Sequence, residues 1–530
     1  MSANKPFVIL RDDGFTQFFY DKPSEFTVEK FLRDNVDFLE DFPDVKVKEF
    51  GLGPGSVFTY DTKVGEVFLE NAPEYAYKIC REGDLNVYGN VKKLIDSGKD
   101  GLQLVTERCH EIGKKVWARL EMNHEYGPPT EENFSWVAFV GSLNKQHPEY
   151  RICNNNPARP EPYHSVKLDF KYQEVRDFKL KILKEAVEHG VDGVSLDFCV
   201  YPPFLSNPQR DYDFITQLLR DVRKMLDEEG EKQGKYLELV VRLEYDSKER
   251  EGLYWDQWIK EDLIDWIIPS VIWINDCFDV PNEEFVKKCK GTKCKVATCI
   301  RPYVGMADTD TKPDDERSGI VRKEKPCLIR TQYAKAFQGL IGGSDAIQVA
   351  LGSGGIMSDG QDEWKPLYGD LANIEFLKEQ EKEYGFNNLD ILPASLTPEE
   401  NKLKLSLRIG DEPTEKHSAV LSFLARGLNY FETITLYVNG HPIELTKKDL
   451  HWSPDDIPLM PERGHHGLMS IHSFILFRID KWWDICRNNI VIPIEYLKKG
   501  TNEFEFVYNL NSENKQFLPL EIGDISLIVS

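Results

Sequence analysis

No apolar run in this chain approaches the roughly 20 residues that a helix needs to span a bilayer. The opening residues, Met-Ser-Ala-Asn-Lys-Pro, also lack the hydrophobic segment of a secretion signal. We therefore expect a soluble chain with no membrane partner. As it stands it would be cytoplasmic, and it would be periplasmic or secreted if a signal peptide has been removed from it.

Positive charge is scarce. The 66 Lys and Arg residues face 89 Asp and Glu residues, which gives a formal net charge of -23 and a pI near 5.1. Such a chain repels nucleic acid and anionic membrane surfaces at long range, although a local basic pocket can still hold an anionic ligand. We expect no nucleic-acid partner.

Cysteine pairs are also missing. The 10 cysteines are scattered, without the density of a disulfide scaffold, and no Cys-x-x-Cys motif occurs. Cys289, Cys294 and Cys299 are evenly spaced, but no nearby His completes a metal-ligand set. We expect reduced, mostly buried thiols, no structural metal and no cofactor.

The 530 residues are too many for one core, and 41% hydrophobic with 29% charged residues is ordinary for a globular protein. Strand-like and helix-like segments alternate over about the first 380 residues, which is typical of a parallel sheet with crossover helices. We expect eight strands, and hence an α/β fold built as a (β/α)8 TIM barrel. The expected strands are Pro6 to Leu10, Val45 to Gly51, Lys115 to Leu120, Gly190 to Leu196, Leu237 to Leu243, Trp266 to Trp273, Lys295 to Ile300 and Asp345 to Ala350. The clearest expected helices are Gly101 to Ile112, Gln173 to His189, Tyr212 to Glu229, Ile329 to Ile341 and Asp370 to Tyr384.

The pattern changes after Tyr384, where short strands recur without long helices. We expect a barrel over 1–385, a linker over 386–402 and a smaller all-β sandwich over 403–530, in which Asn439-Gly440 makes a hairpin turn. The expected strands are Leu403 to Ile409, Ala419 to Leu424, Thr433 to Val438, Ser473 to Ile479, Ile490 to Pro493, Glu503 to Tyr508 and Asp524 to Val529.

One strand carries the strongest functional signal, the run Gly-Val-Asp-Gly-Val-Ser-Leu-Asp-Phe from Gly190 to Phe198. In a strand, Val194 and Leu196 share one face, and Ser195 and Asp197 share the other. If helices cover the apolar face, Asp197 points into the barrel at the strand's carboxyl end. Active sites of TIM barrels lie at that end, so Asp197 is a candidate catalytic residue.

The next expected strand repeats the design in Leu239-Val-Val-Arg-Leu-Glu-Tyr245. Arg242 and Glu244 share the face opposite Leu239, Val241 and Leu243, so Glu244 is the second candidate catalytic residue. Two neighbouring strands thus end in carboxylates. A purely structural alternative is that Asp197 caps a turn and that Glu244 pairs with an arginine.

Other polar and aromatic residues also follow the expected strands. Acidic groups, amides, imidazoles and aromatic faces together suit a sugar, which offers hydroxyl edges and apolar ring faces. We expect a carbohydrate ligand, with anionic polysaccharides and neutral glycans both open. The candidate substrate-binding residues are Asp12, Asp13, Glu121, Asn123, His124, Tyr201, Arg242, Trp273, Asn275 and Arg301.

Several of these residues have structural explanations too. Asp12-Asp13-Gly14 suits a turn with a helix cap. Trp273 and Trp117 suit barrel packing, because large aromatic side chains are common in cores of this size. Glu121 ends an expected strand with inward parity, so it competes with Asp197 and Glu244 for a catalytic role.

Three segments resemble the family-10-like TIM-barrel glycosyl hydrolases: Val187 to Leu205, Leu120-Glu-Met-Asn123, and Trp255 to Ser270. The chain departs from the true family-10 xylanases, which carry glutamates after strands four and seven. Here strand four ends in Asp197 and strand seven in Arg301. The layout is closer to α-amylase-type and endo-fucanase-type barrels. That resemblance implies retaining hydrolysis, with Asp197 as nucleophile and Glu244 as general acid/base.

The segments Leu436-Tyr-Val-Asn-Gly-His and Leu497-Lys-Lys-Gly-Thr-Asn-Glu-Phe-Glu-Phe resemble galactose-binding-like sandwich domains. A module that only stabilises the chain is an equally good interpretation. For the whole chain, the main alternative to a glycoside hydrolase is a noncatalytic carbohydrate-binding or scaffold protein with a degenerate barrel. A lyase or a metal-dependent sugar isomerase is a further alternative. The sequence leaves open the sugar and linkage, endo or exo action, retention or inversion, and the oligomeric state.

Overall fold

The protein is described from a computed structural model. The residues that it describes are 5–12, 14–72, 74–125, 139, 141–152, 166–200, 202–271, 278–300, 303–304, 325–326, 329–350, 367–386, 392, 394–426, 434–443, 450–451, 485–509 and 520–530.

The chain folds into two compact units. The first comprises Met1–Ile272, Pro281–Cys299 and Gly342–Ala372, and the second comprises Trp273–Val280, Ile300–Ile341 and Asn373–Ser530. The domain boundaries expected from the sequence stay a prediction. Within the described part of the chain, no helix combines the length and the apolar character that crossing a membrane requires.

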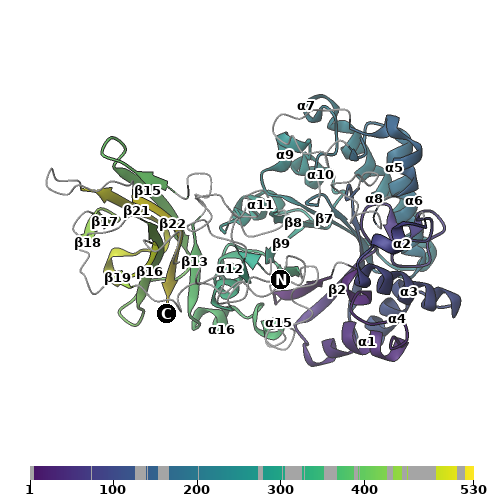
Figure 1. Cartoon of the computed structure of the whole chain (residues 1–530), viewed down its shortest axis with the longest axis horizontal. Helices are drawn as coiled ribbons and strands as arrows, with labels where there is room; N and C mark the ends of the chain where they lie inside the picture. Colours follow the sequence, from purple (N-terminus) through teal and green to yellow (C-terminus); the bar gives the residue numbers. More distant parts are fainter. Residues whose placement is uncertain are drawn as a thin grey trace. The chain divides into compact units, whose positions relative to one another are not determined.

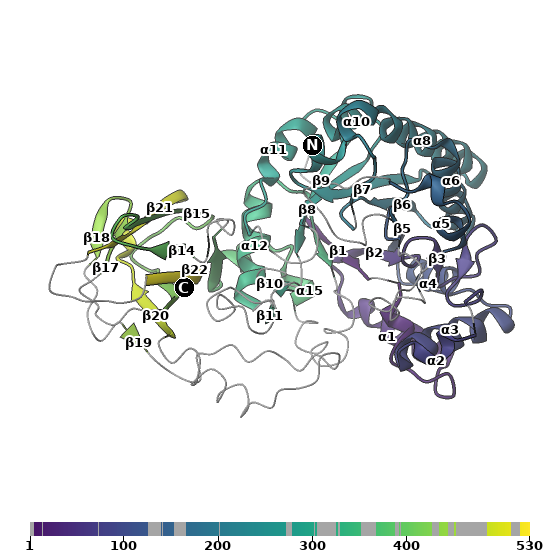
Figure 2. The same ribbon diagram turned by 45° about the horizontal axis from the view of Figure 1, so that its top comes forward.

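The first unit is built on a closed barrel of parallel strands in the order β1-β12-β9-β8-β7-β6-β5-β2 (Figure 1 and Figure 2). This arrangement confirms the predicted TIM barrel, and each of the eight predicted strands coincides with one of these strands to within a few residues. The strands are β1 (Phe7–Arg11), β2 (Val45–Gly51), β5 (Lys115–Glu121), β6 (Gly193–Asp197), β7 (Glu238–Glu244), β8 (Trp266–Ser270), β9 (Lys295–Ile300) and β12 (Ala346–Ala350).

Helices surround these strands (Figure 2). Asp100 caps α4 because its side chain accepts a hydrogen bond from Gln103 N, and Asn207 caps α7 in the same way through Arg210 N. The helices of this unit are α1 (Val28–Asn35), α2 (Ala76–Ile79), α3 (Glu82–Asp96), α4 (Gly101–Glu111), α5 (Ser142–Gln146), α6 (Gln173–Glu188), α7 (Pro208–Asp211), α8 (Asp213–Gln233), α9 (Ser247–Glu251), α10 (Trp255–Lys260), α11 (Asn282–Cys289) and α15 (Leu367–Asp370). A short parallel pair, β3 (Val57–Phe58) and β4 (Glu66–Val67), lies outside the barrel sheet.

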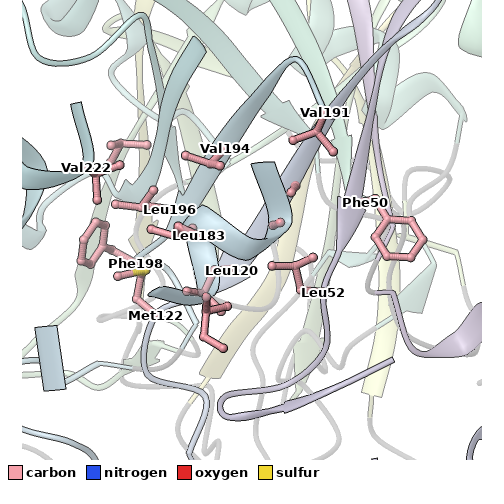
Figure 3. Packing of buried hydrophobic residues seen from close by; sticks show 14 of the residues in the cluster. Phe50, Leu52, Leu120, Met122, Leu183, Val191, Val194, Leu196, Phe198 and Val222 are labelled. Carbon is pink, nitrogen blue, oxygen red and sulfur yellow. The ribbon is translucent and has the colours of Figure 1, made fainter. Parts of the chain in front are cut away.

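The core of the first unit forms between the barrel and its helices. Val194, Leu196 and Phe198 belong to the same buried cluster as Leu183 of α6 and Val222 of α8, and Figure 3 shows them together. The alternate residues of each strand therefore face the barrel interior. Near the amino ends of the strands the interior is apolar and contains residues such as Ile9, Val47, Trp117, Val240 and Trp266. Charged side chains replace them at the carboxyl ends of β1, β5, β6 and β7.

The second unit contains two antiparallel sheets in addition to short elements, which confirms the predicted β-sandwich (Figure 1). One sheet has the order β13-β22-β16-β20-β19 with β14 paired to β22, and the other has the order β15-β21-β17-β18. Their strands are β13 (Lys382–Gly385), β14 (Ala394–Leu396), β15 (Lys402–Ile409), β16 (Ala419–Arg426), β17 (Ile434–Val438), β18 (His441–Ile443), β19 (Leu450–His451), β20 (Ile485–Val491), β21 (Gly500–Tyr508) and β22 (Leu520–Val529). The unit also contains β10 (Tyr303–Val304), β11 (Lys325–Pro326), α12 (Ile329–Ile341) and α16 (Ile374–Lys378). The predicted strand Ser473 to Ile479 lies outside the described residues.

Asn439 and Gly440 form the hairpin turn between β17 and β18, as predicted. Both residues have positive φ, 48° and 83°, which is the requirement of a tight type I′ turn. The side chain of Asn439 also accepts a hydrogen bond from Glu503 N at 2.9 Å, so it fixes the turn against β21.

The predicted helix from Asp370 to Tyr384 is wrong. Asn373 starts a short helix, α16, by accepting a hydrogen bond from Phe376 N, and this helix ends at Lys378. Lys382 to Gly385 then form β13 and pair with β22. Tyr384 donates a hydrogen bond to Asp411 at 2.6 Å, so contacts within the sandwich override the helical spacing. The segment expected as a linker contains β14, which also pairs with β22.

Candidate active site

Asp197 ends β6 inside the barrel, and its side chain is fully buried. Arg242 of β7 is its register partner, and Arg242 Nη1 donates to both carboxylate oxygens at 3.0 Å. Arg11 Nη2, from the end of β1, donates to Asp197 Oδ2 at 3.0 Å, and Arg119 Nη1, from β5, lies 3.4 Å from that oxygen. Cys199 N donates to Oδ1 at 3.0 Å. Three strands thus direct guanidinium groups at one carboxylate.

These arginines set the charge of Asp197. Burial by itself raises the pKa of the carboxyl group, but Arg242, Arg11 and Arg119 outweigh burial and hold the pKa below its ordinary value. Asp197 is therefore an anion at neutral pH. Arg242 is fixed in turn, because its Nη2 donates to Ser270 Oγ at 2.8 Å and to Val271 O at 3.1 Å.

Glu121 lies beside Asp197 as its register partner on β5. Arg119 Nη1 donates to Glu121 Oε1 at 2.5 Å, and Arg11 Nη2 lies 3.5 Å from the same oxygen. Arg11 Nη2 and Arg119 Nη1, two of the three guanidinium nitrogens that contact Asp197 Oδ2, therefore also contact Glu121 Oε1. Burial raises the pKa of Glu121, but Arg119, His124 and Arg11 lower it well below its ordinary value.

The other oxygen of Glu121 contacts an imidazole. His124 follows β5 and directs Nδ1 at Glu121 Oε2, and 13% of its side-chain surface is exposed. Glu121, His124, Asp197 and Arg242 are four of the residues that the sequence nominates, and the structure brings them together. The candidate site thus contains a linked series of charged groups from β1, β5, β6 and β7.

Glu244 lies at the same end of the barrel, two residues beyond Arg242 on β7, where it is the register partner of Ser270. Its Oε2 forms an ion pair with Arg250 of α9, and 10% of its side-chain surface is exposed. Arg250 also contacts Asp246 and Glu251, at 2.8 Å and 3.1 Å. A cation in contact with a carboxylate favours its charged form.

Two nominated residues hold the backbone of this end of the barrel. Asp12 Oδ1 accepts from Gly14 N at 2.8 Å and from Gly51 N at 3.0 Å, which ties the loop after β1 to β2. Asn123 is fully buried. Its Nδ2 donates to Leu168 O and Pro203 O, at 2.9 Å and 2.7 Å, and its Oδ1 accepts from Leu168 N. Asn123 thus uses both of its amide protons on the backbone.

Five nominated residues, Asp13, Tyr201, Trp273, Asn275 and Arg301, lie outside the described part of the chain. Their role in substrate binding stays a prediction.

Sequence reasoning did not nominate Arg11 or Arg119, nor the buried pair in which Gln348 Nε2 donates to Glu49 Oε2 at 2.5 Å. Burial raises the pKa of Glu49 above its ordinary value. Strand parity was the signal for the two arginines. Arg119 lies two residues before Glu121 on β5, and Arg11 lies two residues after Ile9 on β1, so both arginines point into the barrel. Among the described residues, no group of three or more His, Cys, Asp or Glu side chains is placed to hold a metal ion.

No protein-family model matches the chain, and no curated protein sequence matches it. The resemblance to family-10-like glycosyl hydrolases therefore stays a prediction. Among solved structures, the chain is similar to an α-galactosidase from Thermus thermophilus at 12% identity and a TM-score of 0.35. The match covers 73% of this chain and 64% of the galactosidase, so the chain spans less than two thirds of that protein.

Two further solved structures are similar at the same level. A β-L-arabinopyranosidase of glycoside hydrolase family 27 from Geobacillus stearothermophilus is 12% identical with a TM-score of 0.37, over 97% of this chain and 98% of that one. The chitinase ChiW from a Paenibacillus species is 11% identical with a TM-score of 0.40, over 81% of this chain and 49% of that one. Similarities this weak carry no argument about the activity of this chain.

Proposed function

We propose that the protein is a glycoside hydrolase that acts on a poly- or oligosaccharide with retention of configuration. One observation carries the proposal. Asp197 and Glu121 lie on adjacent strands at the carboxyl end of a TIM barrel, and their facing oxygens contact the same guanidinium nitrogens of Arg11 and Arg119. TIM-barrel enzymes carry their catalytic residues at this end of the barrel, so the cluster supports a hydrolase, and retention follows from the proposed role of Asp197 as nucleophile.

Asp197 is the proposed nucleophile. A nucleophilic carboxylate has to be ionised at working pH, and the three arginines that lower the pKa of Asp197 meet that condition. The clamp made by Arg242 holds both carboxylate oxygens, so it also fixes the direction from which Asp197 approaches an anomeric carbon.

Glu244 is the acid/base residue that the sequence nominates. Its position on β7, beyond Arg242 and on the same face, supports this role. Its ion pair with Arg250 weighs against the role, because a general acid has to carry a proton near neutral pH.

One observation favours a second candidate function, a noncatalytic carbohydrate-binding protein. The Asp197 side chain is fully buried and both of its oxygens accept hydrogen bonds from the protein. A buried carboxylate with internal partners also suits a purely structural ion cluster.

Release of reducing ends from a panel of neutral, uronic and sulfated polysaccharides separates the two functions. The hydrolase proposal predicts sugar release by the wild-type chain and a loss of at least about 10³-fold in turnover for Asp197→Ala that circular dichroism shows to be folded, since the covalent route is then closed. NMR of the first product anomer tests retention. Glycan binding without any sugar release over a long incubation would establish the noncatalytic function instead.

A further inference from the structure

We propose that His124, held by Glu121, is the acid/base group of this barrel in place of Glu244. The inference rests on the proposed hydrolase function and deepens it. Its basis is the contact between His124 Nδ1 and Glu121 Oε2, together with the contacts of the other Glu121 oxygen to the two arginines that hold Asp197.

The surroundings of Glu121 keep it charged. Arg119 Nη1 donates to its Oε1 at 2.5 Å, and Arg11 lies 3.5 Å away. An ionised carboxylate that accepts a hydrogen bond from one ring nitrogen of a histidine fixes the tautomer and stabilises the imidazolium. In this proposal Glu121 is a positioning residue, and His124 exchanges the proton with the substrate through its second ring nitrogen, Nε2.

The backbone on both sides of His124 is anchored. Asn123, before it, makes its three hydrogen bonds to Leu168 and Pro203. Glu125, after it, is 1% exposed. His124 lies between these two buried residues, and 13% of its side-chain surface is exposed. A reactive side chain held by buried neighbours on both sides is preorganised for proton transfer.

Three side chains donate hydrogen bonds to Glu125. Lys179 of α6 donates to Glu125 Oε1 at 2.9 Å, and Ser56 Oγ donates to the same oxygen at 2.6 Å. Lys167 Nζ donates to the carbonyl oxygen of Glu125 at 2.8 Å. The loop that carries His124 is therefore bound to a helix, to the loop after β2 and to the segment before α6.

The chemistry balances with these groups. Asp197 forms a bond to the anomeric carbon, and the glycosidic C–O bond breaks with its electron pair on the leaving oxygen, which takes the Nε2 proton of His124. Neutral His124 then removes a proton from a water molecule whose oxygen attacks the anomeric carbon. The ester bond breaks, and its electron pair returns to Asp197.

Glu244 differs from His124 because it forms an ion pair with an arginine. Arg250 contacts Glu244 Oε2, and contact with a cation opposes protonation of a carboxylate. The residue that the sequence nominates therefore has the electrostatic surroundings of a charged structural group, whereas His124 directs Nδ1 at the carboxylate of Glu121.

The test compares His124→Ala, His124→Gln and Glu244→Gln on the polysaccharide that the wild-type chain cleaves, and on a 2,4-dinitrophenyl glycoside of the released sugar. His147→Ala is the matched control, because His147 also directs Nδ1 at a glutamate, Glu149 at 2.9 Å, but 40% of its side chain is exposed. Circular dichroism checks that each variant folds.

We expect both His124 variants to lose about 10²–10⁴-fold in turnover of the polysaccharide, the usual contribution of general acid–base catalysis. The formation of the glycosyl-enzyme from the dinitrophenyl glycoside should change little, because that leaving group needs no proton. Imidazole in solution should restore part of the activity of His124→Ala, and His147→Ala should match the wild-type chain.

Wild-type turnover and an unchanged pH profile in folded His124→Gln would overturn the inference. So would a Glu244→Gln variant that loses turnover of the polysaccharide but still forms the glycosyl-enzyme from the dinitrophenyl glycoside, because that is the behaviour of an acid/base variant. The proposed function fails differently: no glycan is cleaved, or Asp197→Ala cleaves at the wild-type rate, and the inference falls with it.

Discussion

Arg242 Nη1 lies 3.0 Å from both carboxylate oxygens of Asp197, and the two residues are register partners on β7 and β6. Arg11 and Arg119 contact the same carboxylate and also Glu121, so three buried cations have Asp197 and Glu121 as their ion-pair partners. This dependence makes the cluster sensitive to single changes of charge.

Asp197→Asn removes the anion and leaves the arginines in place. Breaking a buried ion cluster from one side costs about 3–5 kcal/mol of unfolding free energy. Because the folded-state pKa of Asp197 is lowered, its stabilisation is complete above the unfolded pKa and is lost as pH falls through the folded value. Denaturant unfolding at pH 7 measures the loss. Asp96→Asn is the control, since Asp96 is 61% exposed, and a loss no larger than that of this control would contradict the account.

Arg11→Gln removes one of the cations that hold Asp197 ionised. The pKa of Asp197 should rise, because Arg11 is one of the groups that lower it. Asp197 then needs a higher pH to ionise. The acidic limb of the profile of kcat/KM against pH should therefore move to higher pH. The profile measured on the cleaved polysaccharide tests this, and a limb that stays in place would show that Asp197 does not set it.

Lys167→Met tests the buried amine beside the His124 loop. Burial lowers the pKa of Lys167 to about 7. The unfolded chain therefore binds more protons than the folded chain between about pH 7 and pH 10, and the stability of the wild-type chain rises with pH across that window.

The methionine variant lacks this titration. It also loses the hydrogen bond of Lys167 to Glu125 O, so the prediction concerns the pH dependence: the stability of the variant relative to the wild-type chain should be highest near pH 7 and fall by on the order of a few kcal/mol toward pH 10. Lys224→Met, at a side chain that is 77% exposed, should show no such trend. A stability difference that does not change with pH would contradict the lowered pKa.

Gly440→Ala tests the hairpin. The φ of Gly440 is 83°, and among the described residues no atom outside Gly440 and its two chain neighbours lies within 4 Å of the position that a Cβ would take, so the cost is backbone strain, about 1 kcal/mol. Thermal unfolding should show a lower Tm for this variant. Gly369→Ala, where space is also open and φ is ordinary, should not be destabilised, and equal effects at both sites would contradict the argument.

The eight barrel strands could be predicted because buried parallel strands are short, apolar and separated by helices. Val194 and Leu196 on one face, with Ser195 and Asp197 on the other, already gave the correct orientation of β6. The strand β13 could not be predicted in this way, because Lys382 to Gly385 read as a continuation of a helix. Their strand conformation comes from pairing with β22, far along the chain.

The site was predictable only in part, for a related reason. Strand ends nominate Asp197, Glu121 and Glu244, but no spacing shows that Arg11 contacts a carboxylate 186 residues away. Nor does the sequence show that Arg250 contacts Glu244, or that the amide of Asn123 is used entirely by the backbone. Partners of this kind are set by closure of the barrel and appear only in three dimensions.

The most direct test of the central claim is peptide mass mapping after labelling with an activated 2-deoxy-2-fluoro glycoside of the sugar that the chain releases. Such a reagent accumulates the glycosyl-enzyme that a retaining hydrolase forms. We predict one adduct, on the peptide that contains Asp197, and none in Asp197→Ala. An adduct on a different carboxylate, or sugar release with no adduct at all, would contradict the assignment of Asp197 as nucleophile.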